Sequence, residues 1–449
     1  MEAALGRQAA TFAVALAVMV AALAAGGPAA ALALVRDAEI EHTLARMADP
    51  LLRAAGLGPH TVRIYIVNDR DPNAFVAGGR NIFVNTGLMT ELGSMDELRA
   101  VIAHEIGHIT GGHLVRRGTD VAGGGLMAIG ALGVLGAAAA GAPEAGIAIA
   151  TGAAQVAHRS ALAYSRGEEA SADQAGLRYL AAAGADPRAM LEVLEHFRGQ
   201  DALLAAGHVD PYALSHPMWS ERLALIEDRV AKLPPGGPPS DEDAYWHARM
   251  VAKLDAFLGS PAQTLRRYPE GDGSEAARLA RAIAWHRRPD PRRAEAAMQG
   301  LLAARPDDPW YLDLEAQFLL ESGKAEAAAA AYRRAAALAP KEPLILGGLG
   351  RALLNMDDDR ATAEARDVLA RAAAADKQNA AVLRDLALAE ARLGNEGAAA
   401  LATAERFVIE DSRRDAGRNA ERAAAFLPEG SPGWRRAQDI ISMARRAPK

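Results

Sequence analysis

The feature that most constrains this chain is the sequence H-E-I-G-H at residues 104–108, together with the helix predicted around it. Within residues 94–114, Ser94 is followed three residues later by Glu97, which is the pattern of a capping box at a helix N-terminus. Apolar residues then recur at helical spacing through the motif. The sequence therefore predicts a helix that carries the motif in its second half.

The motif has the residue types and the spacing of a zinc site. His104 and His108 are four residues apart, so both imidazoles lie on one helix face and can bind the same Zn²⁺ ion. Glu105 is the expected general base, because zinc makes water more acidic and a carboxylate can take the proton as that water attacks a peptide carbonyl. The chain is therefore predicted to be a peptidase that binds one zinc ion.

A catalytic zinc ion needs a third protein ligand, and two schemes compete for it. In metzincins a third His follows six residues after the motif, but this position is Leu114, so the scheme fails. His113 is one residue short, and on a continuing helix it lies about half a turn from the ligand face, which predicts a position at the surface or against a ligand. The other scheme takes a Glu from a later helix.

Residues 165–173 offer such a carboxylate on a predicted helix. Glu169 and Asp173 share a face at the i, i+4 spacing, so Glu169 can bind the metal while Asp173 accepts the free ring N–H of a ligand His. A solvated acidic helix face is the alternative, because many helices carry acidic residues at this spacing.

The composition excludes several other classes of protein. The chain has 50 basic and 56 acidic residues, a formal charge of −6, so it lacks the chain-wide basic character of a nucleic-acid-binding protein. It has no Cys, which excludes disulfides, thiolate metal sites and a Cys nucleophile. Its 449 residues exceed one ordinary hydrophobic core and predict two or more domains.

The N-terminal residues have the pattern of a secretory signal. Arg7 precedes an apolar run at residues 10–25, and small residues suited to a signal peptidase follow. Residues 1–33 are therefore expected to be a signal peptide, with an uncleaved membrane anchor as the alternative. In both cases the body of the protein is expected to be exported.

Residues 34–232 are expected to form the peptidase domain. Its first part predicts a small sheet beside helices, with a helix at 37–57, a strand at 61–67 and a hairpin at 73–85 around Gly78 and Gly79.

An apolar segment at residues 121–157 is expected near the active site. Its first part, residues 121–143, carries no charged residue and is rich in Gly and Ala. It is long enough for a membrane span, but its many glycines favour a mobile apolar hairpin. Such a hairpin would cover the site, touch lipid or bind an unfolded chain.

The remainder of the chain is predicted to be helical. Residues 233–270 begin with a Pro- and Gly-rich stretch and are expected to be a linker with a connecting helix. Residues 271–449 are Ala-rich, and the segment 310–340, with Gly323 at a helix turn, resembles a tetratricopeptide repeat. Further copies are expected at 275–305, 344–376 and 381–410, with an arbitrary helical bundle as the alternative.

Two motifs together carry a family resemblance. H-E-x-x-H followed about sixty residues later by S-R-x-x-E-x-x-A-D resembles the gluzincin metallopeptidases of the HtpX and LoiP type. The resemblance implies that Glu169 is the third zinc ligand and that Asp173 holds a ligand His. It also covers residues 73–89, where it implies that substrate pairs as an added strand.

A third match concerns His216 and Arg222, which stand in the order of the family's H-P-x-x-x-x-R segment. The resemblance implies a catalytic place for both. His216 would cap the zinc ion or stabilise the tetrahedral intermediate, and Arg222 would bind an oxyanion or a substrate carbonyl. Without the resemblance, a His before Pro is an ordinary loop residue.

With its C-terminal repeats the chain is similar to the BepA-like periplasmic members of this group. The implied fold is α+β and mostly helical: a gluzincin-type domain with a small β-sheet, followed by a tetratricopeptide-like solenoid. The implied activity is that of a periplasmic zinc metalloendopeptidase that degrades misfolded or stalled outer-membrane proteins. The repeats would bind unfolded substrate or the outer-membrane assembly machinery, with peripheral membrane contact possible and no nucleic-acid partner.

Two alternatives to this function stay open. The first is a chaperone or adaptor for outer-membrane protein assembly whose protease activity is latent, with the apolar segment plugging the cleft. The second is a membrane-embedded peptidase of the HtpX kind, which requires two firm transmembrane spans.

Overall fold

The computed structural model describes residues 33–59, 61–113, 166–198, 216, 220–237, 240–356 and 358–446. They divide into two compact units: unit 1 contains residues up to 35 and 43–251, and unit 2 contains residues 36–42 and 252 onward. The expected signal peptide lies outside the described residues except for its last position, and the apolar segment at 121–157 lies outside them entirely. The domain boundaries expected from the sequence stay predictions.

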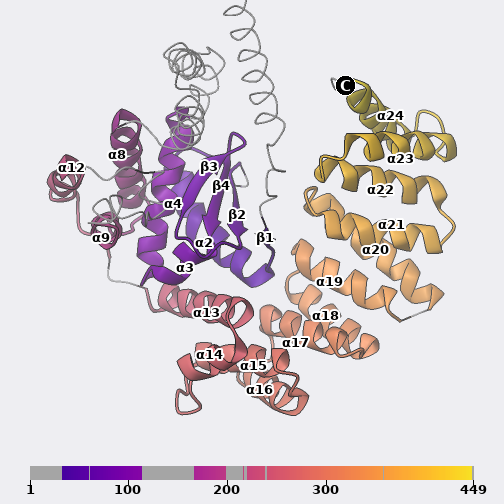
Figure 1. Ribbon diagram of the computed structural model, residues 1–449, viewed down its shortest axis with the longest axis horizontal. Coiled ribbons are helices and arrows are strands. Elements are labelled where there is room, and N and C mark those ends of the chain that lie inside the picture. The colour runs from indigo at the N-terminus through magenta and orange to yellow at the C-terminus, as the bar shows by residue number, and fades with distance from the viewer. Residues whose placement is uncertain are drawn as a thin grey trace, which may run out of the picture. The chain divides into compact units, whose positions relative to one another are not determined.

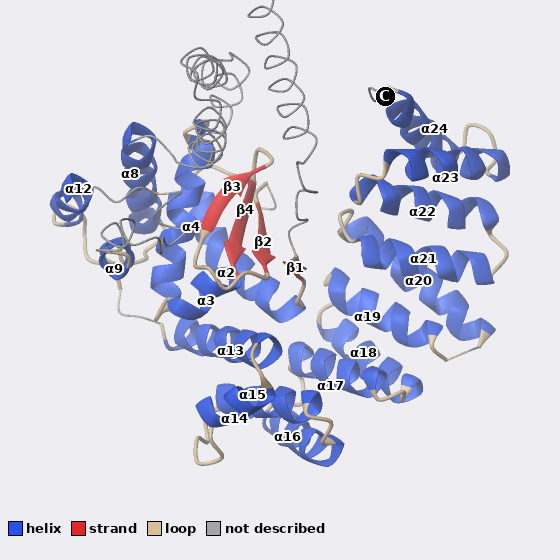
Figure 2. Cartoon of the chain, in the orientation of Figure 1, coloured by secondary structure: helices blue, strands red, loops and turns tan. Residues whose placement is uncertain are grey.

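Unit 1 contains a four-stranded sheet in the order β1-β2-β4-β3, drawn in red in Figure 2. Strands β2 and β4 are parallel, and the two other pairs are antiparallel. Gly78 and Gly79 have φ of +58° and +90°, which lets the chain reverse tightly between β3 and β4, so the expected hairpin is confirmed. The strands are β1 (Leu34–Val35), β2 (Arg63–Val67), β3 (Ala74–Ala77) and β4 (Asn81–Asn85).

Helix α4 (Met95–Thr110) carries the H-E-I-G-H motif through the interior of unit 1. The helix begins where the side chain of Ser94 accepts a hydrogen bond from the N–H of Glu97, as the sequence predicted. Residues 100–108 of the helix are all buried. They are covered because α4 contacts β3, α8 and α9 (Figure 1). The other helices are α2 (Ala38–Ala54), α3 (Thr86–Glu91), α8 (Arg166–Ala182), α9 (Ala189–His196), α12 (Ser220–Val230) and α13 (Asp241–Leu258).

Small residues let α4 and α8 approach each other closely. A Cβ atom at Gly107 would lie 2.6 Å from the carbonyl oxygen of Ala172, and one at Gly176 would lie 3.2 Å from the carbonyl carbon of Ala103. A larger side chain at Gly107 therefore meets rigid backbone. This close approach brings the acidic positions of α8 to the histidines of α4.

Unit 2 consists, beyond α13, of helices that pack in chain order, each against the next (Figure 1). The start of α17 illustrates why they form: Asp308 accepts hydrogen bonds from two backbone N–H groups and Pro309 occupies the first helical position. Gly323, at φ +76°, turns the chain between α17 and α18. The helices are α14 (Pro261–Arg267), α15 (Glu275–Arg287), α16 (Pro291–Ala304), α17 (Pro309–Glu321), α18 (Ala325–Leu338), α19 (Pro343–Leu354), α20 (Asp359–Ala375), α21 (Ala380–Arg392), α22 (Glu396–Ile409), α23 (Arg413–Phe426) and α24 (Pro432–Arg445).

These helix pairs match the repeats expected from the sequence. Pairs α15–α16, α17–α18, α19–α20 and α21–α22 fall on the four predicted copies, and α23–α24 adds a fifth pair. The α+β, mostly helical fold class with a tetratricopeptide-like helical part is therefore confirmed. No helix in the described part of the chain has the length and apolar character that crossing a membrane requires.

A buried ionic cluster lies within unit 2. Lys253 is 1% exposed, and its Nζ lies 2.8 Å from Asp37 and 3.1 Å from Glu39. Asp313 belongs to the same charged environment. Burial, opposed by the charge of Lys253, raises the pKa of the Asp313 carboxyl to about 7.

Candidate active site

The structure brings all of the site residues predicted from the sequence together in the interior of unit 1. Each of them is buried, although they come from separate parts of the chain: α4, α8, position 216 and α12. They are His104, Glu105, His108, Glu169, Asp173, His216 and Arg222.

Four of these side chains converge on one place. Each of them offers one nitrogen or oxygen atom, and these four atoms all lie within 4.8 Å of one another; the residues are His104, His108, Glu169 and His216. The Nε2 atoms of His104 and His108 are 3.0 Å apart. Glu169 Oε1 lies 3.2 Å from Nε2 of His108, and Glu169 Oε2 lies 3.5 Å from Nε2 of His104. A tetrahedral zinc ion, with bonds of about 2.0–2.1 Å, places neighbouring ligand atoms roughly 3.3 Å apart. The donor set and its spacing therefore fit zinc.

The charge of the site also fits a divalent cation. Glu105, Glu169 and Asp173 contribute three buried carboxylates and Arg222 one guanidinium, so three negative charges and one positive charge leave −2 when all are ionised. Burial lowers the pKa of His104, but the charge of Glu169 and the contact with Asp173 outweigh it and raise that pKa to about 10. This negative field attracts a cation into the cluster.

Asp173 and Arg222 form hydrogen bonds and ion pairs with two residues of the cluster, His104 and Glu169. Asp173 Oδ1 lies 2.8 Å from Nδ1 of His104, and the guanidinium of Arg222 donates two hydrogen bonds of 2.8 Å to the Asp173 carboxylate. Arg222 Nη1 also lies 2.9 Å from Glu169 Oε2. Burial would raise the pKa of Glu169, but the charges of His216 and Arg222 hold it well below its usual range. Both α8 carboxylates therefore stay ionised.

His216 joins the cluster to the edge of the sheet. Its Nδ1 lies 3.2 Å from Nε2 of His104, and its Nε2 lies 3.1 Å from the carbonyl oxygen of Ala74. Ala74 belongs to β3, whose only strand partner among the described residues is β4. Because Nδ1 faces the other ligand atoms, Nε2 is the nitrogen that donates a hydrogen to the edge strand.

Glu105 differs from the other carboxylates. It is fully buried, and within the described part of the chain neither of its oxygens has a hydrogen-bond partner. Its Oε1 lies 3.3 Å from Nε2 of His216. Burial raises the pKa of its carboxyl group. A buried carboxylate with open acceptor positions beside a cation site is suited to take a proton from water.

The sequence left two positions open for His113, at the surface or against a ligand. Helix α4 ends at Thr110, so the continuing helix assumed for this position is wrong. His113 is 1% exposed and its Nδ1 lies 2.8 Å from Nδ1 of His108. The structure therefore shows the second position, in contact with the proposed ligand His108.

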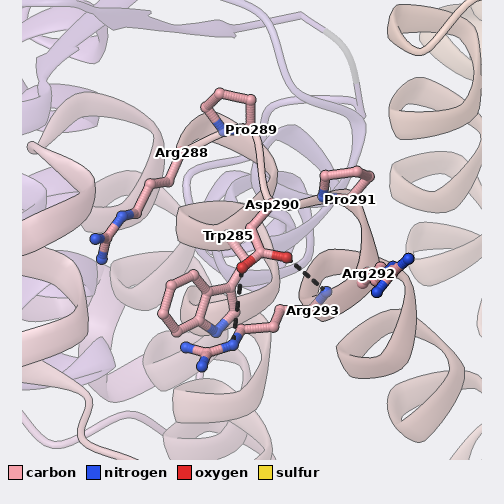
Figure 3. A pocket seen from close by; sticks show the side chains of 7 residues that line it. All are labelled: Trp285, Arg288, Pro289, Asp290, Pro291, Arg292 and Arg293. Atoms are coloured by element: carbon pink, nitrogen blue, oxygen red, sulfur yellow. Dashed lines mark hydrogen bonds and ion pairs between the residues drawn. The ribbon is translucent and has the colours of Figure 1, made fainter.

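A surface hollow in unit 2 offers no comparable site. It is lined by one aromatic residue and the turn that follows it: Trp285, Arg288, Pro289, Asp290, Pro291, Arg292 and Arg293 (Figure 3). The guanidinium of Arg293 lies 4.5 Å from the centre of the Trp285 ring and pairs with Asp290. The lining holds a single carboxylate and no His, so it lacks a set of metal ligands.

The fold and the cluster of unit 1 define the class of this protein: it is a metallopeptidase. Residues 34–230 match the family model described as peptidase family M48. This family is zinc-dependent, and the buried cluster in the same residues fits that metal. The protein is therefore a zinc metalloprotease, a hydrolase.

Relatives extend the similarity beyond this domain. The beta-barrel assembly-enhancing protease of Escherichia coli (strain K12) is 29% identical over 350 residues, which cover 77% of this chain and 70% of that protein. The protein of the same name in Yersinia pestis is 28% identical over 64% of this chain and 60% of its own length. Protease HtpX of Vibrio parahaemolyticus is 38% identical over 81 residues, which are 17% of this chain and 27% of that protein.

Solved structures resemble part of the chain weakly. MamA 41-end from Desulfovibrio magneticus RS-1 is 19% identical with a TM-score of 0.33, covering 38% of this chain and 97% of its own. The pilF structure from Pseudomonas aeruginosa is 18% identical with a TM-score of 0.31, covering 44% of this chain and 98% of its own. The repeat architecture rests on the helix pairs of unit 2 themselves.

Proposed function

We propose that this enzyme is a metalloendopeptidase of the bacterial periplasm that hydrolyses misfolded or stalled outer-membrane proteins. The observation that supports endopeptidase chemistry most directly is Glu105, a buried carboxylate with open acceptor positions beside a converging set of metal ligands. The proposed clients follow from the relatives named beta-barrel assembly-enhancing protease, and the proposed compartment follows from the signal-like pattern of residues 1–33. The tetratricopeptide-like repeats of unit 2 would bind substrate or a partner of the assembly machinery.

His104, His108 and Glu169 are the proposed zinc ligands. Zinc, when bound, supplies Lewis acidity, which makes water easier to deprotonate and polarises a peptide carbonyl. Glu105, whose carboxylate oxygens have no hydrogen-bond partner among the described residues, takes the proton of the attacking water and delivers it to the leaving nitrogen. Its raised pKa suits this exchange, because a carboxyl group whose pKa is nearer neutrality both accepts and returns a proton readily.

His216 is proposed to occupy the fourth ligand position in a resting state. Its Nδ1 lies among the other ligand atoms, while its Nε2 takes the outward carbonyl of Ala74 on the edge strand. A substrate that pairs with β3 as an added strand would compete for that same carbonyl. We therefore expect substrate binding to displace His216, which is then free to help stabilise the tetrahedral intermediate.

Arg222 is proposed to neutralise the two carboxylates of α8. Its guanidinium uses Nε and both terminal nitrogens on Asp173 and Glu169. The sequence resemblance instead implied a contact with an oxyanion or a substrate carbonyl. For that contact the guanidinium would have to give up charge-assisted bonds in a buried setting, so the neutralising role is the better supported of the two.

The proposal is tested with Glu105→Gln, which keeps the size of the side chain and removes its basicity. Zinc content by elemental analysis should stay near that of wild type, while cleavage of unfolded casein should fall by roughly 10²–10⁴. Glu227→Gln, an exposed change on α12, is the matched control and should leave both unchanged. Glu169→Ala should lose zinc and cleavage together. A Glu105→Gln variant with wild-type cleavage would overturn the catalytic assignment.

The same variant decides between the proposed protease and the alternative of a chaperone or adaptor. The repeats of unit 2 are the observation that keeps this second function open, because a solenoid of helix pairs is a binding surface rather than a catalytic one. If Glu105→Gln supports outer-membrane protein assembly as well as wild type, holding of clients is the main role. If assembly fails when cleavage fails, proteolysis is required.

A further inference from the structure

The chain folds back sharply at the end of α4, and two glycines make this possible. The helix is capped by Gly111, and Gly112 then takes φ +64°, a left-handed conformation that favours glycine. The reversal carries His113 back over the last turn of the helix, against His108. A Cβ atom at Gly111 would lie 2.4 Å from Nε2 of His113, so the imidazole occupies space that only glycine leaves open.

Metal binding at Nε2 of His108 would leave Nδ1 as the nitrogen of that ring that carries the proton. Nε2 of His108 faces the ligand cluster, 3.0 Å from Nε2 of His104 and 3.2 Å from Glu169, so in a metal site this nitrogen is unprotonated. Nδ1 of His108 then carries the hydrogen and donates it across 2.8 Å to Nδ1 of His113.

The two imidazoles of α4 are therefore held by different partners. His104 donates from Nδ1 to the carboxylate of Asp173, which is an anion. His108 donates from Nδ1 to the neutral imidazole of His113, five residues later in the chain. A partner of either kind fixes the ring orientation and the tautomer of a metal-binding His.

We propose that His113 is a positioning residue for the zinc site, which orients His108 and keeps its metal-facing nitrogen unprotonated. This inference rests on the ligand set proposed above and adds a residue to it. His113 is not one of the four residues whose ligand atoms converge. It acts through the Nδ1–H of His108, in the way that Asp173 acts on His104.

The test compares two replacements of similar shape in the full chain. His113→Leu fills much of the same space but cannot accept a hydrogen bond, whereas His113→Asn places an acceptor oxygen near the position of Nδ1. Zinc affinity is measured by competition with a chelator at fixed pH, and the ligand field by the visible spectrum of the cobalt-substituted protein. We expect His113→Leu to bind zinc roughly 10- to 100-fold more weakly and His113→Asn to recover most of that loss.

A second pair of variants separates positioning from general stability. Gly112→Ala strains the turn that carries His113, and Gly184→Ala strains a turn with φ +76° elsewhere in unit 1. Neither new methyl group would meet a neighbour among the residues that the structure describes. Both should lose similar stability, but only Gly112→Ala should weaken zinc binding and alter the cobalt spectrum.

The possible outcomes also separate this inference from the ligand set on which it rests. If Glu169→Ala loses zinc while His113→Leu binds it as wild type does, the ligand set stands and the role of His113 is refuted. Equal losses in His113→Leu and His113→Asn would also refute it, because packing rather than the hydrogen bond would then matter. If Glu169→Ala keeps wild-type zinc affinity, the ligand set itself fails.

Discussion

Gly107, the fourth residue of the H-E-I-G-H motif, should be intolerant of even one added methyl group. In Gly107→Ala the new Cβ would lie 2.6 Å from the carbonyl oxygen of Ala172, whereas ordinary contacts of this kind begin at 3.4 Å. Because both partners are helix backbone, α4 and α8 would have to separate locally by the difference, 0.8 Å. Metal sites tolerate displacements of only about 0.2 Å in their ligand distances.

The energetic effect has two opposing parts. Alanine in place of glycine inside a helix is favourable by up to about 1 kcal/mol, because it reduces the freedom of the unfolded chain. Overpacking against rigid backbone costs about 1–3 kcal/mol. We therefore expect a net loss of up to about 2 kcal/mol in the local stability of α4 and α8, with zinc affinity roughly 10- to 100-fold weaker.

Hydrogen exchange measured by mass spectrometry reads this stability helix by helix, which suits a chain of two units. Zinc affinity is measured in parallel by chelator competition. The matched control is Gly300→Ala in α16, where an added Cβ meets nothing within 4 Å in the described part of the chain, so exchange there should slow or stay unchanged. If Gly107→Ala slows exchange in α4 and keeps wild-type zinc affinity, the close approach of the two helices is not what sets the ligand geometry.

Two further predictions concern buried charge. Arg222→Met leaves the carboxylates of Glu169 and Asp173 buried without their cation, so the metal-free unit 1 should lose about 3–5 kcal/mol of stability, measured by hydrogen exchange of α8; a loss under about 1 kcal/mol would contradict the neutralising role. Burial raises the pKa of Asp313 to about 7, above its value of about 3.9 in an unfolded chain, so the folded state binds this proton more tightly. The stability of unit 2 should therefore be highest below pH 4 as far as this group is concerned, and should fall by up to about 1.4 kcal/mol per pH unit as the pH rises from 4 to 7. Asp313→Asn should flatten that fall in a pH series of exchange measurements, and an unchanged slope would show that another group titrates.

Local patterns were sufficient for much of the fold. The helix cap by Ser94, the glycine hairpin at 78–79 and the turn at Gly323 appear as the sequence predicted, although the Glu97 side chain accepts from the N–H of Gly93 and so does not complete the expected capping box. Each depends on residues within a few positions of one another, so local physical chemistry determines it. Strand β1 was missed because it is only two residues long, and the parallel pairing of β2 with β4 joins strands that the hairpin patterns do not relate.

The site was predictable where the spacing was regular and not where the chain turned. His104 and His108 follow from helix geometry, and Glu169 became specific only when its whole motif was considered. His113 lies against a ligand His, one of its two expected positions, but the end of the helix before it was missed, although Gly111 and Gly112 together are a recognisable signal for that end. Arg222 pairs with α8 carboxylates that are 49 residues or more distant from it in sequence, and motif spacing alone does not reveal this contact.

Position 216 and Arg222 lie close in sequence, but the structure holds their side chains with unequal strength. Arg222 makes two charge-assisted hydrogen bonds to Asp173 and an ion pair with Glu169, bonds that are strong in a buried setting. His216 makes a hydrogen bond to the neutral carbonyl of Ala74 and lies 3.3 Å from a Glu105 oxygen, and its Nδ1 makes a ligand contact that a substrate carbonyl can replace. In the proposed ligand set, the side chain of His216 can therefore leave while Arg222 keeps the α8 carboxylates paired. The metal would then stay bound as its fourth position opens, which is what a hydrolase needs and a purely structural zinc site does not.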